Sequence, residues 1–291
     1  MKLITFSYRG TPKAGYIADG EAVVCVSGDR ARNAIRDLVE SEQGLSAFEA
    51  AAGDGAERLA LSDVQLLAPM PEPRRHIFCV GKNYHAHAAE FHASGFDSSG
   101  TEEVPHAPVI FTKTTTCVVG PGESIRATLD PTQSVDYEGE LAVVIGRKAF
   151  KVSRADAYGY VFGYTIMNDV TSRALQKRHQ QWVIGKGLDT FGPMGPVLAT
   201  ADEVGDVTAL NLETRVNGEL RQKATIADLI FDIPTLIETM SATMTLLPGD
   251  IIATGTPVGV GIGFDPPRYL QPGDEVAISI SKIGELSNPV A

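Results

Sequence analysis

The chain is poor in cysteine and in tryptophan. Its 291 residues include one tryptophan and three cysteines, Cys25, Cys79 and Cys117. An odd number of cysteines at such wide spacing provides neither a disulfide framework nor a zinc-binding pattern. We therefore expect free, mostly buried thiols and a cytoplasmic location, where thiols stay reduced.

Positive charge is also scarce. The sequence has 25 Lys and Arg residues against 36 Asp and Glu residues, a formal net charge of −11. Because a surface of this sign repels polyanions, we expect no nucleic-acid partner and no anionic membrane partner. No stretch approaches the roughly 18 apolar residues that cross a bilayer. A hydrophobic content of 43% is instead typical of a folded domain with a large core.

Several common functional signatures are missing. The glycine-rich segment Gly255–Gly263 lacks the GxGxxG pattern of dinucleotide sites and the Lys-Ser/Thr pair of a P-loop. Its backbone N–H groups and the Thr256 hydroxyl could still bind a carboxylate. The zinc motif HExxH is absent as well. The spacing of His85, His87 and His92 does not form one helical face, which disfavours zinc there.

A proline cluster divides the chain. Pro69, Pro71 and Pro73 interrupt any helix or central strand. We therefore expect a small N-terminal domain over residues 1–68 and a larger domain over residues 69–291.

Within the N-terminal part, residues 1–26 alternate apolar runs with turn signals, which predicts an antiparallel meander. Residues 30–42 and 46–61 have helical patterns. Ser46 and Glu49 have the spacing of a capping box, which would begin the second helix.

The larger part is rich in short strand-like runs separated by turns. One helix is predicted over residues 232–246, with Asp232 as its cap and Pro234 in the first turn. Shorter helices are expected after His85 and after Asp169. The predicted fold class is therefore α+β, predominantly β. The predicted strands cover residues 76–80, 108–112, 141–145, 160–167, 196–198, 210–216, 251–254 and 275–280.

Two glutamates precede the apolar run 141–145. Side chains alternate faces along a strand, so Glu138 and Glu140 project to one side, joined by Asp136 if the strand begins that early. Such carboxylates repel each other unless a cation lies between them, and their oxygens suit Mg²⁺, Mn²⁺ or Ca²⁺. The alternative is an exposed edge strand with a polar face. The apolar run that follows favours the buried metal site.

A third acid, Asp169, lies where a strand is predicted to give way to a helix. It could serve as the helix N-cap. Arg173 and Gln176 follow at i+4 and i+7, so all three would share one helical face. An acid, a guanidinium and an amide together suit a carboxylate ligand. Lys186 lies between two glycines, which is consistent either with a surface charge or with contact to an anionic ligand.

His87 and Glu90 lie three residues apart. On a helix this spacing lets the carboxylate orient the imidazole as a general base. The alternative is an incidental pair on a solvated helix. Residues 91–106 lack periodicity and could be a plain loop or a segment that closes over substrate.

Five ordered motifs stand out along the larger part of the chain: CVGKNYHAHAAEF, DYEGELAVVIG, GYTIMNDVTSR, GKGLDTFGPMGPVL and LPGDIIATGTPVGVG. Together they resemble the fumarylacetoacetate hydrolase family, and in particular its domain-containing-protein-2 branch. The resemblance covers about two thirds of the chain. It implies a catalytic domain of the twisted β-roll or sandwich type, a small N-terminal domain and a homodimer.

The resemblance also implies roles for particular residues. It implies that His87 and Glu90 activate water, that Lys186 contributes to catalysis, and that the metal is Mg²⁺ or Mn²⁺, with Ca²⁺ as a possible occupant. An additional Asp ligand of the longest family members has no counterpart in the sequence, so we expect water to complete the coordination. The implied metal ligands are Glu138, Glu140 and Asp169, and the implied substrate contacts are Arg173, Gln176, Lys186 and Thr256.

These features predict a divalent-metal-dependent hydrolase that cleaves a C–C bond of a 2,4-dioxo acid of the acylpyruvate type, with pyruvate enolate as the leaving fragment. The metal would act as a Lewis acid. An oxaloacetate-type decarboxylase, a keto–enol tautomerase or a 2-hydroxyhepta-2,4-diene-1,7-dioate isomerase would use the same enolate chemistry and is the alternative. A non-catalytic module that binds oxo acids is a second alternative.

Overall fold

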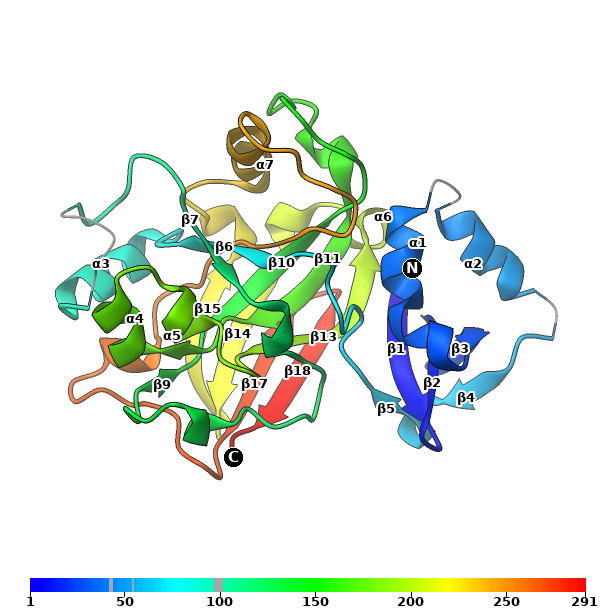
Figure 1. Ribbon diagram of the computed structural model, residues 1–291, viewed down its shortest axis with the longest axis horizontal. Coiled ribbons are helices and arrows are strands. Elements are labelled where there is room, and N and C mark those ends of the chain that lie inside the picture. Colours follow the sequence, from blue (N-terminus) through cyan, green and yellow to red (C-terminus); the bar gives the residue numbers. More distant parts are fainter. Residues whose placement is uncertain (42–43, 54, 97–101) are drawn as a thin grey trace.

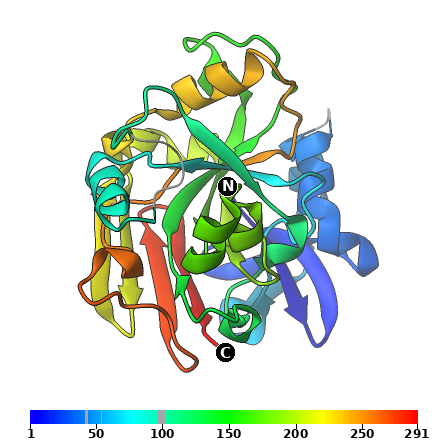
Figure 2. The same ribbon diagram turned by 60° about the vertical axis from the view of Figure 1, so that its left-hand side comes forward.

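The computed structural model describes residues 1–41, 44–53, 55–96 and 102–291. It consists mainly of β-sheet with short helices on its surfaces, as Figures 1 and 2 show from two sides. The predicted α+β class with predominant β-structure is confirmed. None of the helices in these ranges has both the length and the apolar character required to cross a bilayer.

A large mixed sheet forms the centre of the molecule. Its strands run in the order β4-β3-β2-β1-β13-β11-β10-β16-β6-β7, with β5 paired to β1 and β8 paired to β13. The strands are β1 (Lys2–Tyr8), β2 (Thr11–Ala18), β3 (Glu21–Ser27), β4 (Arg58–Ala60), β5 (Gln65–Leu66), β6 (Ile77–Gly81), β7 (Val109–Lys113), β8 (Val118–Val119), β10 (Gly139–Ile145), β11 (Val161–Asn168), β13 (Gly192–Thr200) and β16 (Ile251–Ala253).

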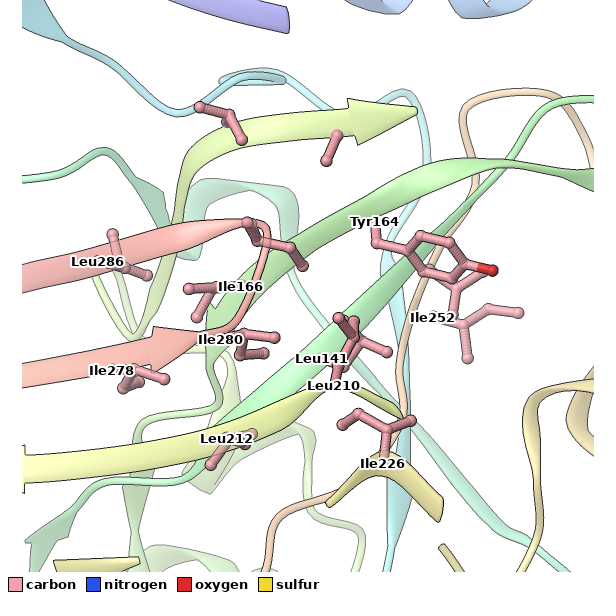
Figure 3. Packing of buried hydrophobic residues seen from close by; sticks show 14 of the residues in the cluster. Leu141, Tyr164, Ile166, Leu210, Leu212, Ile226, Ile252, Ile278, Ile280 and Leu286 are labelled. Atoms are coloured by element: carbon pink, nitrogen blue, oxygen red, sulfur yellow. The ribbon is translucent and has the colours of Figure 1, made fainter. Parts of the chain in front are cut away.

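A second sheet of four strands packs on the main one. Its order is β15-β14-β17-β18, and β9 pairs separately with β12. Leu141, Ile166, Leu212 and Ile278 interdigitate between the two sheets, as Figure 3 shows. The remaining strands are β9 (Val135–Asp136), β12 (Thr171–Ser172), β14 (Asn211–Val216), β15 (Glu219–Thr225), β17 (Glu275–Ile280) and β18 (Gly284–Pro289).

Strand β10 is buried on both of its faces. Its odd-numbered residues Leu141 and Val143 belong to the core between the sheets, whereas Ala142 and Val144 belong to a second core on the opposite face. Glu140 precedes Ala142 in the even-numbered series. Alternation along the strand therefore directs this carboxylate toward the second core rather than toward solvent.

The helices are short and lie around the sheets (Figure 1). Helix α7 begins as predicted, since the Asp232 side chain accepts a hydrogen bond from the Thr235 N–H and Pro234 lies in the first turn. The α-helices are α1 (Ala34–Glu40), α2 (Leu45–Ala51), α3 (His85–Ala93), α4 (Arg173–His179), α5 (Val183–Lys186), α6 (Ala201–Val204) and α7 (Ile233–Ser241). The 3₁₀ helices are η1 (Asp29–Asn33), η2 (Leu61–Asp63), η3 (Thr115–Cys117), η4 (Ala127–Leu129), η5 (Ala157–Tyr160), η6 (Val207–Ala209), η7 (Ile226–Asp228) and η8 (Gly261–Gly263).

The helix predicted over residues 46–61 is wrong in its second half. Helix α2 ends at Ala51, and Arg58–Ala60 forms strand β4. Pairing of β4 with β3 overrides the local helical pattern. The predicted capping box is also wrong, because Gly44 is the N-cap and Ser46 lies inside the first turn.

The main sheet continues across the proline cluster. Strand β1 pairs with β13, so Lys2 lies opposite Ala199 and Leu3 opposite Leu198. The Thr5 hydroxyl donates to the carbonyl of Pro69 at 2.9 Å. The N-terminal strands are therefore hydrogen-bonded into the same sheet as strands of the larger part. A domain boundary between residues 68 and 69 stays a prediction.

Candidate active site and metal centre

Three carboxylates meet where β10 and β11 lie side by side. Gly139 pairs with Asn168 in this antiparallel ladder, so the residues flanking that pair are brought together. The Asp169 N–H donates to the Glu138 carbonyl at 2.9 Å, and the Glu138 N–H donates to Asn168 Oδ1 at 3.0 Å. Ligand atoms of Glu138, Glu140 and Asp169 all lie within 4.8 Å of one another, and all three residues are buried.

Buried cations surround these carboxylates. Lys186 Nζ lies 2.8 Å from Glu138 Oε2 and 2.7 Å from Asp169 Oδ2. Arg173 Nη1 lies 2.7 Å from Glu138 Oε1. Lys113 Nζ, which sequence reasoning missed, lies 2.8 Å from Asp169 Oδ1. Lys186 is therefore not a surface charge. It lies at the end of helix α5 and forms ion pairs with Glu138 and Asp169.

Charge pairing gives Glu138 and Glu140 very different pKa values. Burial would raise the pKa of Glu138, but the adjacent Lys186 and Arg173 charges outweigh it and lower that pKa to about 2. For Glu140, burial together with the Asp169 and Glu138 charges raises the pKa well above its usual value. Glu140 has no salt-bridge partner within the described ranges, and its Oε2 accepts the Gly255 N–H at 2.9 Å.

The donor set fits a divalent cation. Four buried carboxylates cluster with three buried cations, and Glu140 is the one carboxylate of the four without a salt bridge to any of them. Hard carboxylate oxygens are the ligands that Mg²⁺ and Mn²⁺ take in proteins, and a cation beside Glu140 would offset the charge that raises its pKa. The acids are Asp136, Glu138, Glu140 and Asp169, and the cations are Lys113, Arg173 and Lys186.

Asp136 does not join the metal carboxylates, contrary to one sequence expectation. Its Oδ2 lies 2.9 Å from Arg173 Nε, and its Oδ1 accepts the Gly261 N–H at 2.6 Å. The short strand β9 turns this carboxylate toward the guanidinium. Asp136 therefore orients Arg173.

The helical face predicted for Asp169, Arg173 and Gln176 is partly wrong. Helix α4 begins at Arg173 with Ser172 as its N-cap, so Asp169 precedes the helix and caps nothing. Arg173 and Gln176 do share the helix, and Arg173 Nη1 donates to Gln176 Oε1 at 3.3 Å. Arg173 Nη2 is buried without a hydrogen-bond partner in the described part of the chain. This donor suits an oxygen of an anionic ligand.

Lys186 acts as a donor rather than as a base. Burial would lower the pKa of this amine, but the Asp169 and Glu138 charges outweigh burial and raise it. The side chain therefore stays an ammonium at neutral pH. The same pairing with Asp136 and Glu138 raises the pKa of the buried Arg173.

Helix α3 brings a base–carboxylate pair to the site. His87 Nδ1 lies 3.1 Å from Glu90 Oε2, as their spacing predicts, and both side chains are largely buried. This contact leaves His87 Nε2 for chemistry. His85 and His92 are exposed, whereas His87 is buried. Among the described residues, the only cluster suited to a metal is the carboxylate group, so the histidines do not form the zinc site considered from their spacing.

A small cavity is lined by His87 and by the Glu138 and Glu140 carboxylates. One wall is aromatic. The Trp182 ring packs edge-on against the rings of Phe111 and Phe91, with 5.0 and 6.0 Å between the ring centroids. These rings were not predicted from the sequence, because their roles depend on contacts between distant segments. The lining residues are Val80, Gly81, Lys82, His87, Phe91, Phe111, Glu138, Glu140, Arg173, Gln176, Trp182, Lys186 and Thr256.

Thr256 lines the cavity but is held mainly by the protein. Its hydroxyl donates to the Gly139 carbonyl at 3.0 Å and accepts from Gln222 Nε2 at 2.8 Å. Gln222 is buried, and its Oε1 accepts the Gly139 N–H at 3.1 Å. Sequence reasoning missed Gln222, because a glutamine in an otherwise ordinary strand carries no distinguishing signal.

The predicted closing segment at residues 91–106 begins as helix. Helix α3 continues to Ala93, and Lys82 Nζ donates to the Glu102 carbonyl at 2.5 Å. Residues 97–101 of the predicted segment lie outside the described residues. Whether residues 91–106 close over substrate stays a prediction.

Several known proteins are similar to this chain in sequence and architecture. The family model described as "Fumarylacetoacetate (FAA) hydrolase C-terminal" matches residues 76–291. Oxaloacetate tautomerase YisK of Bacillus subtilis (strain 168) is 52% identical over 237 residues, which are 81% of this chain and 76% of that protein. The mitochondrial oxaloacetate tautomerase fahd2 of Xenopus laevis is 39% identical over 259 residues, covering 88% of this chain and 78% of that protein.

A solved structure shows the same fold throughout. The maleylpyruvate hydrolase of Sphingobium sp. SYK-6, solved in complex with manganese(II) ion and pyruvate, superposes with a TM-score of 0.79. Its sequence is 33% identical, and the match covers 100% of this chain and 99% of that one. The sequence match to the family model and the similarity over the whole fold establish that the chain belongs to the fumarylacetoacetate hydrolase family.

Proposed function

We propose that this protein is a divalent-metal-dependent oxaloacetate keto–enol tautomerase. The observation that carries the proposal is that His87, which contacts Glu90, lines the same cavity as Glu138 and Glu140, whose carboxylates cluster with that of Asp169. A metal held beside a base is the combination required to move a proton next to a 2-oxo acid. The relative at 52% identity carries the same activity in its name, which favours tautomerisation over the hydrolysis expected first from the sequence.

The lining of the cavity favours a small acidic substrate. Lys82 lines the cavity together with Arg173 and Lys186, so a four-carbon diacid would meet several cations. A long acyl tail would have to pass the aromatic wall of Phe91, Phe111 and Trp182.

Each residue has a distinct task in this proposal. Glu138, Glu140 and Asp169 would hold Mg²⁺ or Mn²⁺, which when bound supplies Lewis-acid stabilisation of negative charge on the 2-oxo oxygen. Arg173, with its buried Nη2, and Gln176 would orient the C1 carboxylate. Lys186 would donate a hydrogen bond to an oxygen of the substrate. Thr256 would complete the polar lining.

His87 would carry the proton. Enol-to-keto conversion removes a proton from the C2 hydroxyl and adds one at C3, with no change in oxidation state. Glu90 holds Nδ1, so Nε2 can give and take a proton at C3, and the carboxylate stabilises the imidazolium form. The aromatic rings on one wall would limit the access of water to the carbanionic carbon from that side.

Hydrolysis of an acylpyruvate is the second candidate. The intact His87–Glu90 pair favours it, since the same base could activate water for attack on a distal carbonyl. The similar maleylpyruvate hydrolase was solved with manganese and pyruvate, and pyruvate is the kind of product such a cleavage would release. Decarboxylation, diene-diacid isomerisation and ligand binding without turnover remain outcomes of the test. The homodimer and the cytoplasmic location also remain predictions.

The test is a substrate panel followed by NMR. The enzyme is incubated with Mg²⁺ and, separately, with oxaloacetate, an acylpyruvate and a dienoate diacid. Metal-dependent acceleration of enol–keto exchange of oxaloacetate supports the proposal. Cleavage of the acylpyruvate to pyruvate and an acid, without accelerated exchange, would replace it by the hydrolase. Binding of all three acids without any reaction would identify a binding module.

A further inference from the structure

The glycine-rich segment Gly255–Gly263, here called the glycine loop, contains no phosphate-binding motif. Thr256 is its only residue with a role in the proposed function. In the structure the glycine loop contacts three carboxylates that come from three different elements. Its backbone N–H groups supply the hydrogen bonds, which is chemistry that requires no particular side chain. The contacts run from Gly255 N to Glu140 Oε2 (2.9 Å), from Gly259 N to Glu90 Oε1 (3.0 Å), from Gly261 N to Asp136 Oδ1 (2.6 Å) and from Ile262 N to Asp136 Oδ2 (3.0 Å).

These contacts connect the two halves of the site. Glu140 belongs to the metal carboxylates, and Glu90 belongs to the base–carboxylate pair on helix α3. Asp136 is buried and also binds Arg173 Nε at 2.9 Å. The glycine loop is therefore in direct contact with the proposed metal ligand Glu140, with the partner of the substrate-binding arginine and with the carboxylate that orients His87.

Gly263 is the loop residue whose missing side chain leaves room for the Glu90 carboxylate. A Cβ atom at this position would lie 1.9 Å from Glu90 Oε1, and its three nearest neighbours would all be atoms of the Glu90 side chain. Gly261 differs, because a Cβ there would meet the backbone carbonyl oxygen of Arg268 at 2.5 Å and Asp136 Oδ1 at 2.7 Å. An alanine at 263 would consequently displace the Glu90 carboxylate with little direct effect on the backbone.

We propose that the glycine loop is a positioning element for proton transfer. Gly263 and the Gly259 N–H set the Glu90 carboxylate, and through it the His87 imidazole, while Asp136 fixes the loop to Arg173. This inference deepens the proposed function and rests on it for its kinetic test. Gly263 is a positioning residue, since it acts only through Glu90.

A double-mutant cycle tests this role. Gly263→Ala, Glu90→Ala and the double variant are compared for kcat and KM with oxaloacetate and for Mn²⁺ affinity. We expect Gly263→Ala to lower kcat at least about 10-fold, with KM and Mn²⁺ affinity within about twofold of the wild type. In the Glu90→Ala background the added methyl group has no carboxylate to displace, so the same change should alter kcat less than about twofold.

Gly159→Ala is the matched control, because a Cβ at Gly159 has no neighbour within 4 Å. Equal losses from Gly263→Ala in both backgrounds would show a general structural effect and overturn the proposal. An unchanged kcat in the otherwise wild-type protein would overturn it as well.

A second readout does not depend on turnover. The ¹⁵N chemical shifts of the His87 ring report the Nδ1–Glu90 contact directly, and we expect Gly263→Ala but not Gly159→Ala to change them. If the wild-type protein fails to accelerate oxaloacetate tautomerisation, the proposed function fails while this comparison still decides the role of the loop. Identical His87 shifts in both variants and the wild type would refute the positioning role.

Discussion

The carboxylate cluster and the His87–Glu90 pair both contribute side chains to one cavity, Glu138 and Glu140 from the first and His87 from the second, but they are built differently. The carboxylates lie in or next to adjoining strands of the main sheet, and buried cations bind Glu138 and Asp169 at 2.7–2.8 Å. The base pair lies on the nine-residue helix α3 and depends on one contact between its members and one backbone N–H from the glycine loop. Ligand binding is therefore built into the sheet, whereas proton transfer is contributed by a helix placed against it.

This difference indicates that binding and turnover can be separated by mutation. Changes in the sheet carboxylates should remove the metal and everything that depends on it. Changes on helix α3 should spare the metal and remove proton transfer. The predictions below test this separation, beginning with the greatest loss.

Glu140→Gln should reduce metal-dependent activity to the rate measured in metal-free buffer. Loss of a metal's charge stabilisation is worth several kcal/mol, roughly a 10³-fold change in rate or more. Because Glu140 has no salt-bridge partner within the described ranges, the metal-free fold should not lose stability. Mn²⁺ titration, kinetics and thermal melts check both statements, with the exposed Glu275→Gln as control. Full activity of Glu140→Gln, or of the wild type without metal, would contradict the metal site.

His87→Ala should lower tautomerase or hydrolase turnover about 10²-fold or more, the usual contribution of a general base. Metal affinity should stay within about twofold. Decarboxylation of oxaloacetate requires no base at C3, so any such activity should largely survive. His85→Ala, an exposed change on the same helix, is the control. Equal loss of turnover and metal affinity would show that the two regions do not act separately.

Lys113→Met should weaken Mn²⁺ binding about 10- to 100-fold, as removal of groups that orient metal ligands does. It also leaves the buried Asp169 without one of its two cations, so unfolding should become easier by a few kcal/mol. Calorimetric titration and chemical denaturation measure the two effects. The exposed Lys148→Met is the control. Unchanged metal affinity would limit Lys113 to a structural role.

The pH dependence of the stability of the metal-free protein should reveal the raised pKa of Glu140. A carboxyl whose folded pKa is raised stabilises the fold fully below the unfolded pKa, about 4.3, and this stabilisation is lost as pH rises toward the folded value. Metal-free wild type should therefore lose stability relative to Glu140→Gln by up to about 1.4 kcal/mol per pH unit in that range.

Glu138 should contribute with the opposite sign, since its pKa is lowered to about 2 and its stabilisation is lost as pH falls toward that value. Both proteins retain Glu138, so the difference between them reports the charge of Glu140 together with its effect on Glu138. Added Mg²⁺ should reverse the loss in the wild type above pH 5 or so. If the free energy of unfolding changed with pH in the same way for wild type and Glu140→Gln, the raised pKa of Glu140 would be refuted.

Local patterns were sufficient where one element or one short spacing decided the outcome. Strand β17 was predicted with its observed bounds, Glu275–Ile280. The i,i+3 spacing predicted the His87–Glu90 contact, because a helical turn fixes that distance. Local patterns failed for residues 58–60, where pairing with β3 decides the structure, and for Asp169, which precedes helix α4 instead of capping it.

The sequence by itself determined the predominantly β class, the carboxylates suited to a divalent metal and, through its motifs, the family. Only the tertiary structure decided that Lys113 supports Asp169, that Asp136 turns to Arg173, and that the glycine loop contacts both halves of the site. These contacts join residues that are far apart in the chain, with separations of 56, 37 and 169 positions. Local spacing carries information only over a turn of helix or along one strand, so contacts of this range arise from packing.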